Sequence, residues 1–355
     1  MADGAGAGMA VDIADQPEVF TRLVEPTQAK AIAEVAATVA GRAPRQVVFA
    51  ARGISDNAAR YAAYLCEVRL GLPAGLTSPS AMTVFGARPD LSGALVVGVS
   101  RTGTSPDLAQ VLQIARGSGA LTLALTNDPG SALAGAAELV VDIGAGAERA
   151  VAATKTYTAE LLALLMLVEG IRAGHGALPP GERAALAVLP ELAALTIADP
   201  TAPELAARYR LVDRIVTTGR GYAYPTAREA ALKLMETSYL ASMALSGADL
   251  LHGPLAMTYP GVPVLAVVGA GPGGRSMREV LARLESRRAD VVAVGAGAVD
   301  RPAARLRVPA LEERHAPLLD ILPLQRFALA LALARGQDPD GPGGPRQAAG
   351  RGEEF

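Results

Sequence analysis

Four hydroxyl side chains gather around one glycine directly after an expected buried strand at residues 95–99. They stand in the segment 100–105, which reads SRTGTS and is followed by Pro106. Serine is favoured at a helix N-cap and proline in the first helical turn, so a helix is expected to begin here. A helix N-terminus at the carboxyl end of a parallel strand binds anions through its N–H groups. The segment therefore predicts a phosphate site. A Ser/Thr turn that only caps the helix is an equal alternative.

Two glutamates suit acid–base chemistry. Glu229 and Glu236 lie seven residues apart in an expected helix at 226–238, which places both on one face. Their neighbours are mostly Ala, Leu and Met, and a carboxylate in such surroundings can serve as a general base. The alternative is a pair of solvated or structurally bridged carboxylates, which the spacing alone favours.

One histidine stands in an unusual context. His252 lies in the segment 250–256, which reads LLHGPLA. The Gly-Pro pair after it does not suit a regular helix or strand, so a shaped loop is expected. A histidine there can transfer protons, and a capping or core histidine is an equal alternative.

The elements that must position these residues occur twice in the chain. Residues 47–53 (VVFAARG) and 215–221 (IVTTGRG), about 168 residues apart, each read as an apolar strand with an Arg-Gly turn before a helix. Buried strands at 95–99 and 263–267 repeat with the same shift. Continuous apolar strands alternating with helices indicate a parallel sheet covered on both faces. The sequence predicts an α/β fold with two tandem domains, each a doubly wound parallel sheet flanked by helices.

Changes in composition set the expected domain boundaries. A Gly/Pro cluster after residue 173 breaks any regular element, with a short amphipathic helix expected behind it. The front segment 16–41 is expected to be helical and to pack against the first domain. The expected organisation is a flexible N-terminus (1–15), a phosphate-binding domain (16–172), a linker (173–200), a second domain with the acid/base residues (201–335) and a C-terminal tail (336–355).

The loop of the second copy differs from that of the first. Residues 269–274 read GAGPGG, with no hydroxyl, and they fit the pattern G-x-G-x-x-G. No acidic residue ends the next strand to hold a ribose, so the match to a dinucleotide site is weak. We interpret this loop as a degenerate copy of the segment 100–105.

The composition of the whole chain narrows the functional classes. The net charge of −2 argues against nucleic acid as a partner, because a binder of the phosphate backbone needs a basic surplus. One cysteine, Cys66, excludes a disulfide framework, and three histidines argue against a His-rich metal site. The N-terminus has no basic region, and the apolar run 161–168 is far shorter than the roughly 20 residues that span a membrane. We expect a cytoplasmic protein with no membrane contact and no metal, nicotinamide or pyridoxal cofactor.

Several ordered motifs, taken together, resemble the sugar isomerase (SIS) family, over nearly the whole chain from about residue 16 to 340. The likeness is to the isomerase half of glutamine–fructose-6-phosphate aminotransferase and to stand-alone amino-sugar-phosphate deaminases and isomerases. The motifs are GIS at 53–55, SRTGTS at 100–105, VAATKT at 151–156, GRG at 219–221, the segment 229–239 and HGPLA at 252–256.

The resemblance implies roles for nine residues and a homodimer with a shared active site. It implies that the 6-phosphate is held by Ser100, Arg101, Thr102 and Ser105, that Ser55 contacts the substrate, and that Val151 and Ala153 line the sugar. It also implies that Glu236 moves a proton between C1 and C2. The resemblance further implies that the ring is opened by His252, which in this family can come from the neighbouring subunit.

The chain also departs from the aminotransferase. No glutaminase domain is expected before the repeat, so the chain is not expected to make ammonia from glutamine. The aminotransferase holds its ketose on a tail lysine, whereas no lysine follows Lys233 here. Ile54 and Ala153 replace hydroxyl residues.

The resemblance implies an amino-sugar 6-phosphate enzyme that opens the ring and abstracts the C2 proton, of the glucosamine-6-phosphate deaminase/isomerase type. The first alternative is a lyase (dehydratase) that eliminates water from N-acetylglucosamine 6-phosphate, and the missing tail lysine keeps it open. The second alternative is a non-enzymatic sugar-phosphate sensor. Retention of both Glu236 and His252 favours an enzyme, because binding alone requires neither.

Overall fold

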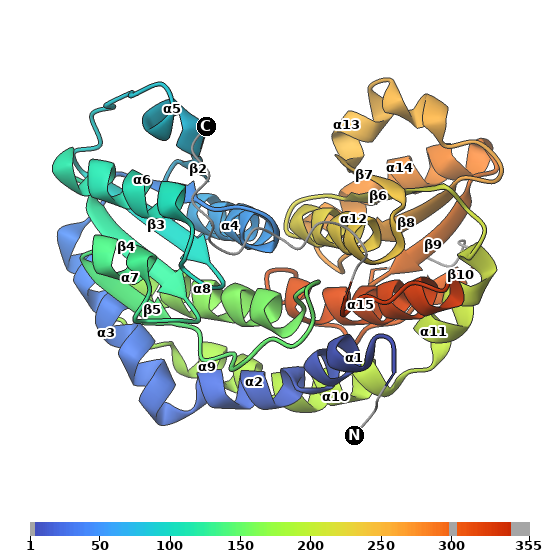
Figure 1. Cartoon of the computed structure of the whole chain (residues 1–355), viewed down its shortest axis with the longest axis horizontal. Coiled ribbons are helices and arrows are strands. Elements are labelled where there is room, and N and C mark those ends of the chain that lie inside the picture. The colour runs from blue at the N-terminus through green and yellow to red at the C-terminus, as the bar shows by residue number, and fades with distance from the viewer. Residues whose placement is uncertain (1–3, 298–303, 342–355) are drawn as a thin grey trace. The chain divides into compact units, whose positions relative to one another are not determined.

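The computed structural model describes residues 4–297 and 304–341 of the chain, which form two compact units (Figure 1). The first unit contains residues 18–147 and 155–188. The second unit contains residues 4–17, 148–154 and the described part of 189–341. Helix α2 (Gln16–Val24) is where the chain first passes from the second unit into the first.

The first unit is built on a five-stranded parallel sheet in the order β2-β1-β3-β4-β5, with helices on both faces (Figure 1). Its strands are β1 (Gln46–Ala50), β2 (Ala74–Leu76), β3 (Ala94–Ser100), β4 (Leu121–Thr126) and β5 (Leu139–Asp142). Its other helices are α3 (Pro26–Arg42), α4 (Ile54–Leu65), the π-helix η1 (Cys66–Leu70), α5 (Pro79–Thr83), α6 (Pro106–Gly117), α7 (Ala132–Ala136), α8 (Lys155–Ala173) and α9 (Pro180–Ala187).

The second unit repeats this arrangement. Its parallel sheet has the order β10-β9-β8-β6-β7, which read from β7 is the order of the first unit. Its strands are β6 (Arg214–Gly219), β7 (Ala241–Ser246), β8 (Pro263–Val267), β9 (Asp290–Val294) and β10 (Ala304–Leu306). Its helices are α1 (Ala7–Ala14), α10 (Leu189–Ala198), α11 (Thr201–Ala206), the 3-10 helix η2 (Ala207–Tyr209), α12 (Ala223–Ser238), α13 (Gly247–Leu251), the 3-10 helix η3 (Pro254–Met257), α14 (Pro272–Ser286) and α15 (Pro317–Ala334). The predicted α/β fold with two tandem parallel sheets is confirmed.

Alternate residues of the central strands serve opposite layers, as the pleat of a strand requires. Val48 and Val96 pack in the core beneath α6, whereas Val47 and Leu95 face the layer of α3 and α8. Both sides of each central strand are therefore apolar, which explains the unbroken apolar runs in the sequence.

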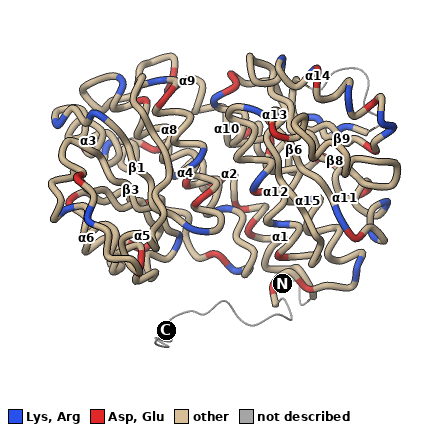
Figure 2. The backbone as a smooth tube through the Cα atoms, turned by 90° about the horizontal axis from the view of Figure 1, so that it is seen from above, with Lys and Arg blue, Asp and Glu red and all other residues tan. Residues whose placement is uncertain are grey.

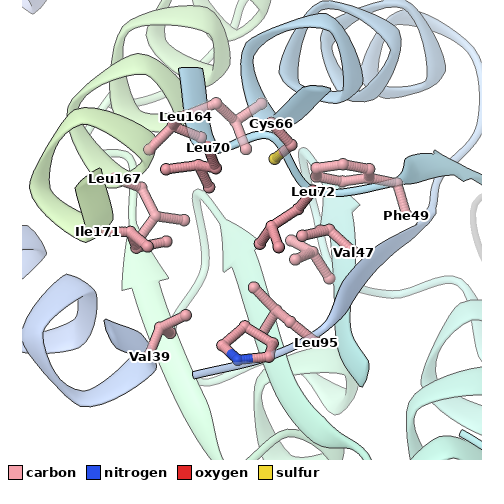
Figure 3. A pocket seen from close by; sticks show the side chains of 13 residues that line it. Val39, Val47, Phe49, Cys66, Leu70, Leu72, Leu95, Leu164, Leu167 and Ile171 are labelled. Atoms are coloured by element: carbon pink, nitrogen blue, oxygen red, sulfur yellow. The ribbon is translucent and has the colours of Figure 1, made fainter. Parts of the chain in front are cut away.

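The layer between the first sheet and α3 and α8 leaves one small apolar cavity (Figure 3). Its volume is about 10 Å³, close to the space that one water molecule needs. Cys66 is among its lining residues. Burial, with a smaller contribution from the charge of Glu67, raises the pKa of the Cys66 thiol to about 12. The thiol is protonated at neutral pH and does not act as a nucleophile.

The N-terminal segment differs from the expected flexible segment 1–15. Ala7–Ala14 forms helix α1, with Met9 and Ile13 buried. Both carboxylate oxygens of Asp340 accept hydrogen bonds from its first turn, from Gly8 N at 2.6 Å and Met9 N at 2.8 Å. A short helix is marginal alone, so these contacts with a distant part of the chain stabilise it.

One other segment also differs from expectation. The expected linker 173–200 holds two helices, α9 and α10, where we expected one short helix. Part of the expected tail 336–355 is ordered, because Asp338 and Asp340 bind α1. Residues 342–355 lie outside the described residues.

Helix α15 has the length and the hydropathy of a membrane span. It is 18 residues long with a mean hydropathy of 1.5, and 72% of it is buried in the structure. A core helix has the same properties, and α15 packs inside the second unit (Figure 1).

Acidic and basic positions are interspersed along the backbone of both units (Figure 2).

The buried side of α15 carries a carboxyl group. Asp320 is 1% exposed, and its Oδ2 accepts no hydrogen bond from any described residue. Burial, and then the charge of Glu313, raises the pKa of Asp320 well above its usual value. Stability from a group with a raised folded-state pKa is fully present below its unfolded pKa of about 3.9 and is lost as the pH rises toward the folded pKa. Asp320 therefore reduces stability progressively above pH ~4.

We expect Asp320→Asn to raise the free energy of unfolding at neutral pH. The gain over the parent protein should grow above pH ~4 by at most about 1.4 kcal/mol per pH unit, until the folded pKa is reached. Urea unfolding at three pH values between 4 and 7 measures this gain in the free energy of unfolding. The exposed Asp213→Asn, in the same unit, is the control. Equal stability of parent and D320N at all three values would contradict the expectation.

Candidate active site

The segment 100–105, called the phosphate loop below, joins β3 to α6 in a fixed turn. Ser100 Oγ accepts a hydrogen bond from Gly103 N at 3.1 Å. Gly103 has a φ of 60°, and a Cβ there would lie 2.1 Å from Ser131 Oγ, so only glycine fits. The carbonyl oxygen of Arg101 accepts a hydrogen bond from Asn127 N, just beyond the neighbouring strand β4. Local and tertiary contacts thus fix the backbone of the loop.

The loop presents hydroxyl groups beside a helix N-terminus. Thr102 Oγ1 and Thr104 Oγ1 lie 2.8 Å apart, and both residues are exposed. Ser105 is the N-cap residue of the 12-residue helix α6, as predicted, but its hydroxyl makes no capping hydrogen bond. It donates instead to Asp107 Oδ1 at 2.5 Å. The first-turn N–H groups of α6 are therefore not capped by Ser105, and together with the threonine hydroxyls they suit a phosphate.

A cation also lies at the start of α6. Arg52, between β1 and α4, donates from Nε to Asp107 Oδ2 at 2.8 Å, and its side chain is 57% exposed. Partial burial raises the pKa of Asp107, but the hydrogen bonds from Arg52 and Ser105 outweigh it and hold the pKa below its usual value. Asp107 is thus ionised at neutral pH and fixes the guanidinium next to the phosphate loop.

Ser55 is more enclosed than a substrate contact would suggest. Its side chain is 3% exposed, and its Oγ donates to Glu160 Oε1 of α8 at 2.7 Å. Glu160 is fully buried. In this arrangement the hydroxyl of Ser55 donates its proton to a carboxylate. The hydroxyl oxygen can therefore only accept a hydrogen bond from a substrate.

Three charged residues lie together on one face of α12. Lys233 Nζ lies 2.5 Å from Glu236 Oε2 and 3.6 Å from Glu229 Oε1. The predicted common face of the two glutamates is confirmed. Glu229 and Lys233 are fully buried, whereas the side chain of Glu236 is 25% exposed. Glu236 is therefore the member of the cluster that a substrate can reach.

The buried lysine keeps its charge. Burial lowers the pKa of Lys233, but the negative charges of Glu229 and Glu236 outweigh this, and the pKa lies above its usual value. An ammonium group thus stands between two carboxylates at neutral pH, and its hydrogen bond orients Glu236.

The loop 148–154, called the sugar loop below, carries Val151 and Ala153. Val151 is 37% exposed, while Ala152 and Ala153 are buried at 1% and 3%. The loop belongs to the second unit, as α12 does. Glu148 of this loop adds to the negative charge around Lys233, which couples the sugar loop to the cluster on α12.

His252 occupies the predicted irregular position. It is the C-cap residue of α13 and precedes Gly253, whose φ is 115°. The histidine is exposed, and among the described residues its side chain neither bonds to Glu236 nor forms an ion pair with it. The chain itself therefore does not join its two predicted proton-transfer groups.

The predicted site residues fall into two groups, one in each unit. The first unit holds Ser55, Ser100, Arg101, Thr102 and Ser105, and the second unit holds Val151, Ala153, Glu236 and His252. The residues of the first group lie in the loops or first helical turns that follow the carboxyl ends of β1 and β3, where α/β folds bind ligands, whereas Glu236 lies in the last turn of α12.

The sequence profile of the SIS domain family matches residues 42–170 and 209–335, one match for each sheet. The chain belongs to the SIS domain family. This SIS protein is 33% identical over 310 residues to the glutamine–fructose-6-phosphate aminotransferase of Gloeobacter violaceus, an alignment covering 84% of the chain and 50% of that protein. It is 34% identical over 306 residues to the enzyme of the same name from Methanothermobacter thermautotrophicus, again over 84% and 50%. The chain spans about half the length of these curated relatives.

Solved structures give the same relationship. A putative phosphosugar isomerase from Silicibacter pomeroyi is 35% identical, with a TM-score of 0.85 over 94% of this chain and 99% of that one. The C-terminal domain of glucosamine-fructose-6-phosphate aminotransferase from Francisella tularensis is 25% identical, with a TM-score of 0.83 over 96% and 100%. The SIS protein is thus similar to phosphosugar isomerases.

Two residues near the predicted site were not among its predicted members. The sequence indicates Arg52 only as part of an Arg-Gly turn, and Lys233 only as the last lysine of the chain. The spacing of Lys233, four residues after Glu229 and three before Glu236, is the spacing of paired charges on a helix and could have found it. Nothing local indicated that Arg52 meets Asp107, because the two residues lie on different loops.

The second glycine loop of this SIS protein holds a carboxylate of its own chain. Glu313 accepts hydrogen bonds from Gly273 N at 3.1 Å and Gly274 N at 2.8 Å, at the N-terminus of α14. A Cβ on Gly271 would lie 2.4 Å from Glu313 Oε2, so the missing side chain makes room for this carboxylate. The helix begins at Pro272, and Glu313 satisfies two of its first N–H groups.

Proposed function

We propose that this SIS protein is an amino-sugar 6-phosphate enzyme of the glucosamine-6-phosphate deaminase/isomerase type. The observation that carries the proposal is the cluster on α12. A partly exposed carboxylate, Glu236, is held at 2.5 Å by a fully buried lysine in a family of phosphosugar isomerases. An oriented carboxylate is what proton transfer between two neighbouring carbons needs.

The phosphate loop supports a phosphorylated substrate. Its fixed backbone, the exposed hydroxyls of Thr102 and Thr104, and the N-terminus of α6 supply hydrogen-bond donors without a net charge. Arg52, together with Arg101, adds positive charge nearby. In the proposal Ser100, Arg101, Thr102 and Ser105 hold the 6-phosphate, and Ser55 accepts a hydrogen bond from the sugar.

In the proposed reaction the substrate reacts in its open-chain form, with an aldehyde at C1 and an amino group at C2. Glu236 binds Lys233 through Oε2, which leaves Oε1 to take the proton from C2. The C2–H electrons form the C1–C2 double bond while the C1 carbonyl electrons move to O1, which takes a proton from solvent to give an enol. Glu236 then returns its proton to C1, and the amino nitrogen forms a double bond to C2 and releases one proton to solvent. The product is a C2 imine, and water cleaves it to fructose 6-phosphate and ammonia. Lys233 holds the side chain of Glu236 in place through its hydrogen bond to Oε2.

Ring opening needs a second proton-transfer group. We propose His252 for this role, supplied by a second copy of the chain in a homodimer. The exposed position of His252, out of contact with Glu236 within the chain, supports this arrangement. The proposal includes a cytoplasmic location for the enzyme.

The lyase alternative uses the same first step. An N-acetylated substrate cannot lose ammonia. Its enol would release the O1 proton to solvent and re-form the C1 carbonyl, a C2–C3 double bond would form, and the C3 hydroxyl would leave as water with the proton held by Glu236. Residues 234–355 contain no lysine that could capture the ketose as an imine, which supports the lyase as the second candidate.

The deciding experiment offers the protein glucosamine 6-phosphate and N-acetylglucosamine 6-phosphate. We expect ammonia and fructose 6-phosphate in equal amounts from the first, measured by coupled enzymatic assays. New ultraviolet absorbance of an unsaturated carbonyl from the second would favour the lyase. Glucosamine without phosphate is the matched control and should react far more slowly, because it lacks the group that the phosphate loop binds. Binding of both phosphosugars without turnover of either would refute both reactions and favour a sensor.

A further inference from the structure

The sugar loop is held at its start by a buried carboxylate from helix α1. Asp12 is fully buried. Its Oδ2 accepts hydrogen bonds from the backbone N–H groups of Arg149 at 2.7 Å and Ala150 at 2.9 Å. Its Oδ1 accepts another from Arg149 Nη1 at 3.0 Å. Hydrogen bonds to an ionised acceptor are shorter and stronger than neutral ones, so Asp12 fixes two successive residues of the loop.

The far end of the sugar loop is held in the same way. Glu148 Oε1 accepts hydrogen bonds from Thr154 N at 3.1 Å and from Thr154 Oγ1 at 3.3 Å. Gln325 of α15 donates to the carbonyl oxygen of Thr154 at 3.2 Å, and Gln16 in turn donates to Gln325 at 2.8 Å. Only residues 151–153 lie between the two fixed ends.

The geometry of Asp12 is more specific than stability requires. Burying a carboxylate is costly, and an apolar side chain would stabilise the packing of α1 at lower cost. What an apolar side chain cannot do is bind two adjacent N–H groups. Asp12 thus defines the shape of the residues that follow, including the exposed Val151.

We propose that Asp12 is a positioning residue, which acts by holding the sugar loop in the conformation that contacts the sugar. This inference rests on the proposed function, because the roles of Val151 and Ala153 belong to it. Its consequence is that the N-terminal helix α1 is part of the substrate-binding unit. Asp340, which binds the first turn of α1, supports the same helix from the other end.

The test compares Asp12→Asn with Asp15→Asn in the full-length protein. Asparagine has the shape of aspartate but only one acceptor atom, so D12N loses at least one of the three hydrogen bonds. Asp15 accepts a hydrogen bond from the same side chain, Arg149 Nη1, at 2.8 Å, so D15N is the matched control for a carboxylate lost beside Arg149. We expect D12N to raise KM for glucosamine 6-phosphate about tenfold, as the loss of one charge-assisted hydrogen bond would.

Inorganic phosphate as a competitive inhibitor separates positioning from a general loss of structure. Its Ki should be unchanged in D12N, because the phosphate loop belongs to the other unit. D15N should change neither constant. An unchanged KM in D12N, or KM and Ki that rise together, would overturn the proposal.

Amide hydrogen exchange tests the same contacts without turnover. Peptides covering 148–154 should exchange at least about tenfold faster in D12N, while peptides from α15 keep the rates of the parent protein. If the parent protein turns over neither phosphosugar, the proposed function fails, and the exchange rates then decide about Asp12. Unchanged exchange of 148–154 would overturn the positioning role whatever the activity.

Discussion

Replacing Glu236 with glutamine is expected to lower kcat for glucosamine 6-phosphate by about 10²- to 10⁴-fold, the usual contribution of a general base. The glutamine side chain has the same length and still accepts a hydrogen bond from Lys233, but it cannot take the C2 proton. KM should change little, because the phosphate loop of the first unit is intact. Steady-state kinetics of fructose 6-phosphate formation measure both constants.

A second readout separates chemistry from folding in E236Q. Exchange of the C2 hydrogen with deuterium from solvent, followed by NMR, reports the proton abstraction itself and should fall in parallel with kcat. The exposed Glu279→Gln on α14 is the matched control and should behave as the parent protein does. Exchange at the parent rate in E236Q would show that another group abstracts the proton.

Lys233→Met is expected to reduce the free energy of unfolding by about 3–5 kcal/mol. Methionine fills nearly the same space, so the loss is electrostatic. Lys233 is fully buried and lies against two carboxylates, one of them also fully buried. Without the ammonium group, the buried carboxylate of Glu229 loses a positive charge that lies 3.6 Å away, and breaking one side of a buried ion pair is among the most costly substitutions.

Urea unfolding at neutral pH measures the change in K233M. Lys30→Met is the control, because its side chain is 77% exposed and its ion pair with Glu34, at 3.8 Å, contributes little. The double variant E229Q/K233M should recover part of the lost stability, since it removes the buried negative charge together with its cation. A loss below about 1 kcal/mol in K233M would mean that the lysine does not neutralise the two glutamates.

Local patterns predicted the elements that recur in the chain. The apolar runs of β3 and β8 are buried along their central lengths, and such strands form between helices wherever they stand in the sequence. Pro106 begins α6, as its fixed φ suggests. The seven-residue spacing placed Glu229 and Glu236 on one face. The exposed strand β7 escaped prediction, because it is an edge strand in which exposed and half-buried residues alternate.

Long-range contacts decided the rest. Glu313 fills the second glycine loop from about 40 residues away, so the loss of hydroxyls there is matched by a carboxylate that the motif does not contain. Arg52 meets Asp107 across 55 positions. Such pairs depend on which loops the sheet brings to one edge. The periodicity of helices and strands along the sequence does not predict these contacts.

The sequence by itself determined the two repeated sheets, the phosphate loop and the face of α12 that carries Glu236. Only the tertiary structure decided what holds these parts in place. Asp12 binds residues 137 and 138 positions away, and Asp340 binds α1 from more than 330 positions away. The physical reason is that strands and helices follow from neighbouring side chains, whereas a buried polar group is stable only where the folded chain supplies its donors.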